Sequence, residues 1–193
     1  MRVLSALSII ILARSIAPSF AIPLSADSTT TSHLSPRSNY CANAPSTVAG
    51  TPLGPRDQLL PPTPSLPPRV LPSSPLWCAY GSSTYVTITW GYSIAGDAVM
   101  NLLNSVHNEI GNHIARAGDH LVPQGFISIA DFGLELRMVN ANNHQQTWGV
   151  MNAGIAALMQ FMQRSGRGPG AVAWQVYDGQ NMVGVGFLQP LNP

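Results

Sequence analysis

Two neighbouring segments carry the clearest periodic patterns in the chain. From Thr84 to Trp90, β-branched and aromatic residues are interspersed with threonines, which is typical of a strand. Across 95–117, apolar residues recur every three or four positions, which predicts a helix with one buried face. Asp97 suits the positive end of this helix, and Gly118 suits its end. The predicted buried face carries Val99, Leu103, Val106, Ile110 and Ile114.

The second half of the domain passes from β to helical patterning and back. Residues 125–140 alternate on both sides of a central break, which predicts one bent strand or a hairpin. Thr147 is a good N-cap, because its hydroxyl can accept a hydrogen bond from a free backbone N–H of the helix that follows. Two further strand-like runs flank Asp178-Gly179, a strong hairpin-turn signal: 171–177 and 182–188.

The predicted order is therefore strand, helix, strand or hairpin, helix, hairpin. Few charges and abundant glycine favour antiparallel pairing. We expect an α+β fold in which an antiparallel sheet of four to five strands has two helices packed on one face. This globular domain is predicted to span 76–193.

The first 75 residues lack these periods. Residues 1–21 combine Arg2, an apolar run over 3–13 and small residues ahead of Ala21, which predicts a signal peptide cleaved after Ala21. Residues 22–75 are rich in serine, threonine and proline, which favours a disordered, proline-rich arm of the kind that is often O-glycosylated. We therefore expect a secreted, extracellular protein with no membrane attachment after cleavage.

The chain has two cysteines, Cys41 and Cys78. An even number of cysteines in an oxidising compartment favours one disulfide between them. The alternative is that Cys41 stays free or pairs elsewhere.

Charge restricts the range of partners. Charged residues make up 9% of the chain, against the roughly 25% that is usual for soluble domains, and every basic residue is arginine. The formal net charge is +1, which leaves no basic face for nucleic acid. We expect an extracellular partner, either a polysaccharide or a protein.

One group of proteins shares the patterns of the C-terminal half. The run NNHQQTWGV over 142–150, the following Ala-rich helix, Tyr177-Asp178-Gly179 and the VGVG of 183–186 resemble uncharacterised small secreted fungal proteins with a TWGV…DG…VGxG core. The resemblance implies secretion and a fungal source. It implies no activity and supplies no catalytic residue.

No complete catalytic or cofactor motif is present. A zinc-binding helix places its histidines four residues apart, whereas His107 and His113 are six apart and flank the apolar face from opposite sides. We therefore predict neither a metal nor a cofactor. The best candidate catalytic pair consists of the carboxylates Asp131 and Glu135, close in sequence on a predicted strand, because a glycosidase needs two such groups.

Three functions remain open, and the sequence favours a non-enzymatic binding or effector-like protein. Its candidate binding residues are Trp90, His144 and Trp148. The alternatives are a small secreted hydrolase that uses Asp131 and Glu135, and a structural component of a cell wall or matrix. Both carboxylates in one cleft would favour the enzyme, and an exposed flat surface around the binding residues would favour the binding protein.

Overall fold

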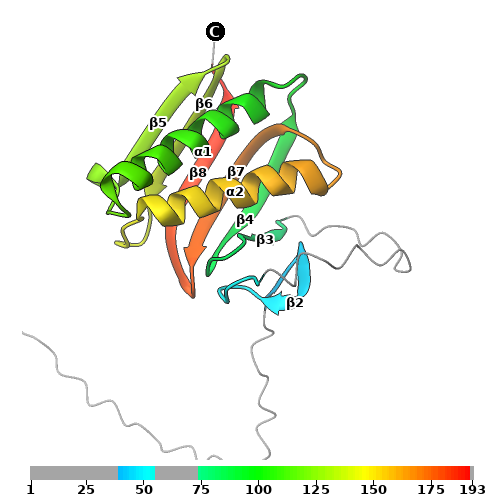
Figure 1. Ribbon diagram of the computed structural model, residues 1–193. Helices are drawn as coiled ribbons and strands as arrows, with labels where there is room; N and C mark the ends of the chain where they lie inside the picture. The colour runs from blue at the N-terminus through cyan, green and yellow to red at the C-terminus, as the bar shows by residue number, and fades with distance from the viewer. Residues whose placement is uncertain (1–38, 55–73, 192–193) are drawn as a thin grey trace, which may run out of the picture. The chain divides into compact units, whose positions relative to one another are not determined.

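The computed structural model describes residues 39–54 and 74–191, which contain an antiparallel six-stranded sheet with two helices over one of its faces (Figure 1). The helices are α1 (Ala98–Ala117) and α2 (Trp148–Arg164). In the order in which they lie across the sheet, the strands are β3 (Leu76–Cys78), β4 (Thr84–Ser93), β7 (Gly170–Asp178), β8 (Asn181–Pro190), β6 (Leu134–Asn140) and β5 (Phe126–Asp131).

Each helix is followed by a hairpin, and the two hairpins meet in the sheet. A short 3-10 turn, η2 (Pro123–Gly125), leads from α1 into β5 and β6, and α2 leads into β7 and β8. Strand β6 pairs with β8, while β4 pairs with β7. Phe132 and Gly133 join β5 to β6 with positive φ angles of 53° and 74°, the backbone of a two-residue hairpin turn. The alternating run 125–140 is therefore a hairpin rather than one bent strand.

Alternate strand residues face the helices and form the core. In β4, Val86 and Ile88 are fully buried toward the helices, and Thr87 lies on the opposite face of the sheet, here called the open face. The face predicted for α1 is confirmed, since four of its five residues are buried and Ile114 packs against the core. Burying one such side chain contributes about 1.5–3 kcal/mol, so this core fixes both helices on the sheet.

The predicted α+β class, the antiparallel pairing and the two helices on one face are confirmed. The expected four to five strands were too few, because the sheet has six. Strand β3 was missed because its three residues are too short for an alternating pattern and follow Pro75. It pairs with β4, with Trp77 opposite Val86.

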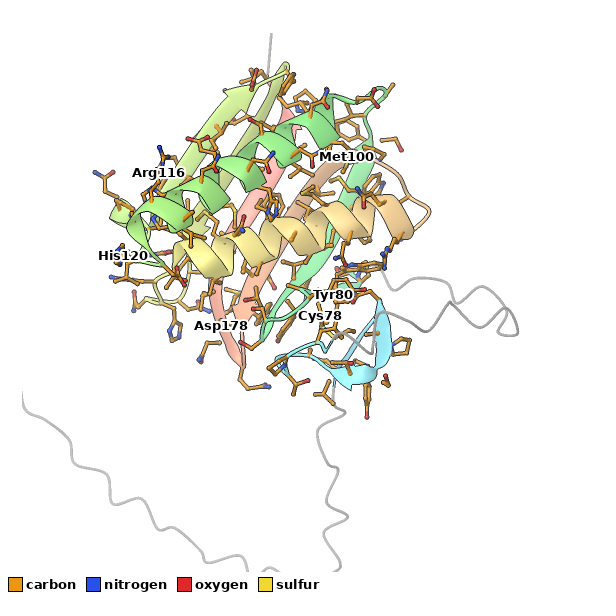
Figure 2. The ribbon with its side chains drawn as sticks, in the orientation of Figure 1. Cys78, Tyr80, Met100, Arg116, His120 and Asp178 are labelled. Carbon is orange, nitrogen blue, oxygen red and sulfur yellow. A yellow bond between two sulfur atoms is a disulfide. The ribbon has the colours of Figure 1, made fainter. Side chains whose placement is uncertain are left out.

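Part of the expected disordered arm is ordered. Within 22–75, residues 39–54 contain the short hairpin of β1 (Tyr40–Cys41) and β2 (Ala44–Val48), so the prediction is wrong for this stretch. The Cys41–Cys78 disulfide is present, with 5.6 Å between the two Cα atoms, and Figure 2 shows Cys78 beside the hairpin. The hairpin is held by this bond and by a small apolar cluster that includes Leu53 and Tyr85, neither of which the serine and proline content reveals.

The predicted signal peptide, 1–21, lies outside the described residues, as do 22–38 and 55–73 of the arm. Neither α1 nor α2, the two α-helices of the described part, is long and apolar enough to cross a membrane.

Candidate functional site

The residues of the TWGV and VGVG runs and their neighbours build the fold. The Gln146 side chain is completely buried, and its Nε2 donates a hydrogen bond to the Val139 carbonyl over 3.1 Å. A Cβ atom on Gly184 would collide with the Gln146 amide, and one on Gly186 would collide with the Trp174 ring. The two glycines of the VGVG run therefore make room for buried side chains.

The TWG run forms the N-terminus of α2. Thr147 caps the helix, because its Oγ1 accepts a hydrogen bond from the Val150 N–H over 3.3 Å. Asp119 adds to the cap: it accepts hydrogen bonds from the Thr147 hydroxyl over 3.1 Å and from the Gly149 N–H over 2.8 Å. A side chain at Gly149 would meet the Asp119 carboxylate. This part of the motif stabilises a helix end and presents no reactive group.

The two candidate carboxylates do not share a site. Glu135 pairs with Ala130 and lies on the open face, where its Oε1 accepts a hydrogen bond from Ser128 over 3.3 Å. Asp131 is one residue further along β5, paired with the buried Leu134, so its side chain points to the helix-covered face. Its carboxylate accepts a hydrogen bond from the Phe132 N–H in the hairpin turn. The sheet thus separates the two groups.

The three candidate binding residues do not form one surface either. Trp90 packs into the core, with its ring centroid 6.1 Å from that of Phe161 near the end of α2. Trp148 is the first residue of α2, so it lies at the opposite end of that helix. His144 is exposed in the loop ahead of α2. Of the three, Trp148 lines the pocket between α1 and β5.

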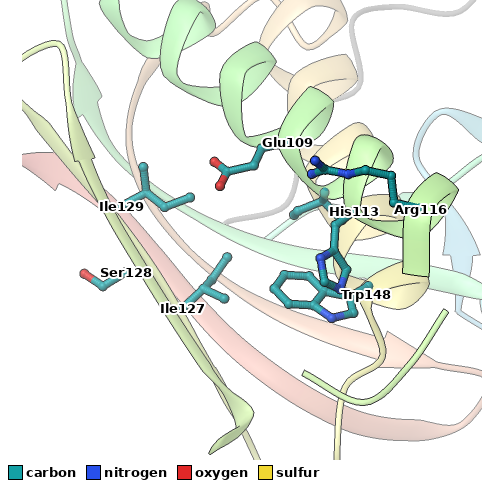
Figure 3. Close-up of a pocket in the computed structure, with 8 residues that line it drawn as sticks. Glu109, His113, Arg116, Ile127, Ser128, Ile129 and Trp148 are labelled. Atoms are coloured by element: carbon teal, nitrogen blue, oxygen red, sulfur yellow. The ribbon is translucent and has the colours of Figure 1, made fainter. Parts of the chain in front are cut away.

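That pocket lies between α1 and β5 and is called the α1–β5 pocket (Figure 3). Its volume is about 280 Å³. Small-molecule sites commonly occupy about 300–1,000 Å³, so it can hold one bulky side chain or a small ring. The residues that line it are Glu109, Ile110, His113, Arg116, Ile127, Ser128, Ile129 and Trp148.

The pocket combines an apolar interior with an aromatic wall and charged groups. Ile127 and Ile129 point from β5 toward α1 in Figure 3, and the His113 ring lies with its centroid 4.6 Å from that of Trp148. Glu109 and Arg116 come from the same side of α1. Within residues 39–54 and 74–191 the one ion pair is Arg137–Glu135, so neither Glu109 nor Arg116 has a partner of opposite charge there.

Glu109, His113 and Arg116 were not predicted as a binding site from the sequence. The spacing i, i+4, i+7 of the three residues does place them on one side of a helix. What turns that side into a pocket is strand β5, whose position beneath α1 depends on its pairing with β6. No group of three or more histidine, cysteine or acidic side chains in the described ranges is arranged to hold a metal ion.

The open face carries a second, wider hollow of about 560 Å³ across β4, β7 and β8. The residues around it are mostly small, polar or aromatic and include Ser74, Thr87, Thr89, Ala173, Gln175 and Phe187. Beside it, the Arg137 guanidinium carbon lies 5.1 Å from the centroid of the Phe126 ring and 5.5 Å from that of Phe187. Its Nε is 3.6 Å from the Glu135 carboxylate. The only two charges of this area therefore offset each other.

Comparisons with family models, with curated proteins and with solved structures gave no match to this chain.

Proposed function

We propose that this protein is exported and acts outside the cell as a non-enzymatic binding protein whose ligand occupies the α1–β5 pocket. One observation carries the proposal: this pocket joins an apolar interior and an aromatic wall to two charged side chains that have no partner of opposite charge in the described residues. An apolar cavity with a few convergent polar groups is the usual form of a ligand site. The disulfide, which is typical of proteins in oxidising compartments, supports export.

The positions of the acidic groups favour binding over hydrolysis. Glycoside hydrolysis needs two carboxyl groups that flank one scissile bond. Asp131 and Glu135 lie on opposite faces of the sheet, and the pocket contains a single carboxylate, that of Glu109. A binding role requires no second acid.

The test is a titration of the isotope-labelled protein with a library of small aromatic and aliphatic amines and carboxylates, followed by NMR. The four tryptophan indole N–H signals provide an internal control, because of the four only Trp148 lines the α1–β5 pocket. Trp77 and Trp174 are buried in the core, and Trp90 packs against it. We expect ligands to shift the Trp148 signal and the Ile127 and Ile129 methyl signals. The absence of any shift at these signals, with small compounds and with short peptides alike, would contradict the proposal.

A second candidate function is polysaccharide binding on the open face. The observation that favours it is a hydrogen-bond relay, in which the Gln175 Oε1 accepts from the Tyr177 hydroxyl over 2.9 Å and from the Thr87 hydroxyl over 3.2 Å. Both bonds use the amide oxygen, so the Gln175 NH2 group remains a donor for a sugar hydroxyl. In the same NMR experiment with soluble cell-wall oligosaccharides, shifts at Thr87, Gln175 and Phe187 would select this candidate.

A further inference from the structure

The two edges of the sheet differ in how they are closed. At the β3 edge, the Ala42 N–H donates to the Leu76 carbonyl over 2.8 Å. The Asn43 side chain makes two bonds to Cys78: its Nδ2 donates to the carbonyl over 2.8 Å and its Oδ1 accepts from the N–H over 3.0 Å. The 39–54 segment thus satisfies the outward backbone groups of β3, as edge protection requires.

The β5 edge has no such cover in the described part of the chain. Strand β5 is twice as long as β3, and β6 is its one partner there. In a hairpin with a two-residue turn, the pair next to the turn is hydrogen-bonded, and every second pair after it is too. Ile127 and Ile129 therefore bond to β6, whereas the N–H and C=O groups of Phe126, Ser128 and Ala130 point outward.

Large exposed apolar residues gather around this edge. Phe126 begins β5, Phe132 forms the turn after it, and Leu191 is hydrogen-bonded to that turn through Gly133. These three are among the six large hydrophobic residues that are most exposed in the described part of the chain. A row of free backbone groups with apolar residues at both ends is suited to pairing with another extended chain.

We propose that the ligand of the α1–β5 pocket is an extended peptide that pairs with β5 as a further antiparallel strand and inserts one bulky apolar side chain into the pocket. The inference rests on the proposed function and names its ligand class. Alternate side chains of such a strand would point to the same side as Ile127 and Ile129, which is the side on which α1 lies. Backbone bonds would provide affinity, and the pocket would provide specificity.

The two charged side chains of α1 indicate which peptide residues should flank the apolar residue that enters the pocket. Helix α1 runs toward the start of β5, so Arg116 lies near the beginning of that strand (Figure 2), whereas Glu109 points toward Ile129, further along it (Figure 3). An antiparallel peptide passes Glu109 first and Arg116 last. Charge complementarity therefore selects a basic residue two positions before the apolar one and an acidic residue two positions after it.

The experiment uses the disulfide-bonded protein and a display library of random twelve-residue peptides. We expect enrichment of sequences in which a basic, an apolar and an acidic residue occupy positions i, i+2 and i+4. Every second amide of an enriched peptide can be N-methylated in two alternative sets. Methylation of the set whose N–H groups face β5 should abolish binding, and methylation of the other set should not. If small compounds bind the α1–β5 pocket and no peptide is enriched, the inference fails and the proposed function stands. If neither binds, both fail.

Two variants separate the backbone contribution from the charges. Ser128→Pro removes an outward N–H and leaves the backbone bonds to β6 intact, so it should abolish peptide binding. The matched Ser128→Ala variant also loses the side-chain bond to Glu135 but keeps the N–H, so it should retain peptide binding. The double variant Glu109→Arg/Arg116→Glu should reverse the preferred charge order, with roughly a tenfold change in the relative affinity for the two orders. An unchanged charge preference would overturn the inference. So would the finding that the unliganded protein is a dimer and that Ser128→Pro dissociates this dimer.

Discussion

At the scale of single residues, polar side chains are matched to glycines that leave room for them. The Gln146 amide occupies the space beside Gly184, and the Asp119 carboxylate occupies the space beside Gly149. Each pairing joins a loop to a regular element, because Gln146 bonds to β6 and Asp119 bonds to the start of α2. These contacts account by packing for Thr147, Gly149 and the glycines of the VGVG run, whereas Trp148 of the TWGV run lines the α1–β5 pocket.

Replacement of Gly184 by alanine should therefore destabilise the protein. The added methyl group would collide with the buried Gln146 amide, and overpacking of this kind typically costs about 1–3 kcal/mol. The matched control is Gly111→Ala in α1, where the new Cβ meets nothing within 4 Å and should stabilise the helix by about 0.5–1 kcal/mol. Chemical denaturation measures both values, and equal effects would contradict the packing account.

Tyr85 should make the protein sensitive to alkaline pH. Burial raises the pKa of its phenol above the ordinary value of 10.0, and Tyr177, stacked on it with ring centroids 4.7 Å apart, raises the pKa further. The unfolded chain therefore loses this proton first as the pH rises. The stabilisation is complete below pH 10 and is lost as the pH increases through the raised value.

The Tyr85→Phe variant should unfold with a shallower loss of stability above pH 10 than the natural protein. The exposed Tyr92 provides the control, since Tyr92→Phe should keep the original profile. Denaturation midpoints between pH 8 and 11 measure the difference, within the range in which a tyrosine titrates. Identical profiles for the natural protein and Tyr85→Phe would show that this phenol does not contribute.

At the scale of the elements, the sequence predicts whatever is encoded by local periodicity. The apolar face of α1 and the Thr147 cap were found from residues that are neighbours in the chain. So was the β7–β8 hairpin, although its turn consists of Gly179 and Gln180, one residue later than predicted. Strand β3 and the 39–54 hairpin were not predicted, because the contacts that hold them together, a disulfide and the Asn43 side chain, join residues far apart in the sequence. The α1–β5 pocket was missed for the same reason, since it requires β5 to be placed beneath α1.

The disulfide is the element-scale feature that can be tested by removal. The Cys41→Ser/Cys78→Ser double variant should lose about 4 kcal/mol of unfolding free energy, because the bond closes a loop with a sequence separation of 37. The 39–54 segment should then become sensitive to limited proteolysis, while the core around α1 and α2 keeps its helical circular dichroism. The exposed Ser46→Ala change on β2 serves as the control. An unchanged free energy of unfolding would show that Asn43 and the apolar cluster alone hold the segment.

At the scale of the whole described domain, the sheet is closed on one side and available on another. Both helices cover one face, the 39–54 segment covers the β3 edge, and the β5 edge keeps three residues with outward backbone groups. Above β5, Glu109 and Arg116 have no partner of opposite charge in the described residues, and the Arg116 Nε donates to the Asn112 carbonyl over 3.1 Å. The α1–β5 pocket adjoins this free edge, which is why we assign both to one ligand.

Amide hydrogen exchange on the intact protein, with and without the tightest peptide from the display library, tests this assignment most directly. In the free protein the Ile127 and Ile129 amides should be protected by β6, and the Ser128 and Ala130 amides should exchange rapidly. Bound peptide should slow exchange at Ser128 and Ala130. Slow exchange there in the free protein would contradict the account, and so would protection by peptide that appears instead at Thr87 and Gln175 on the open face.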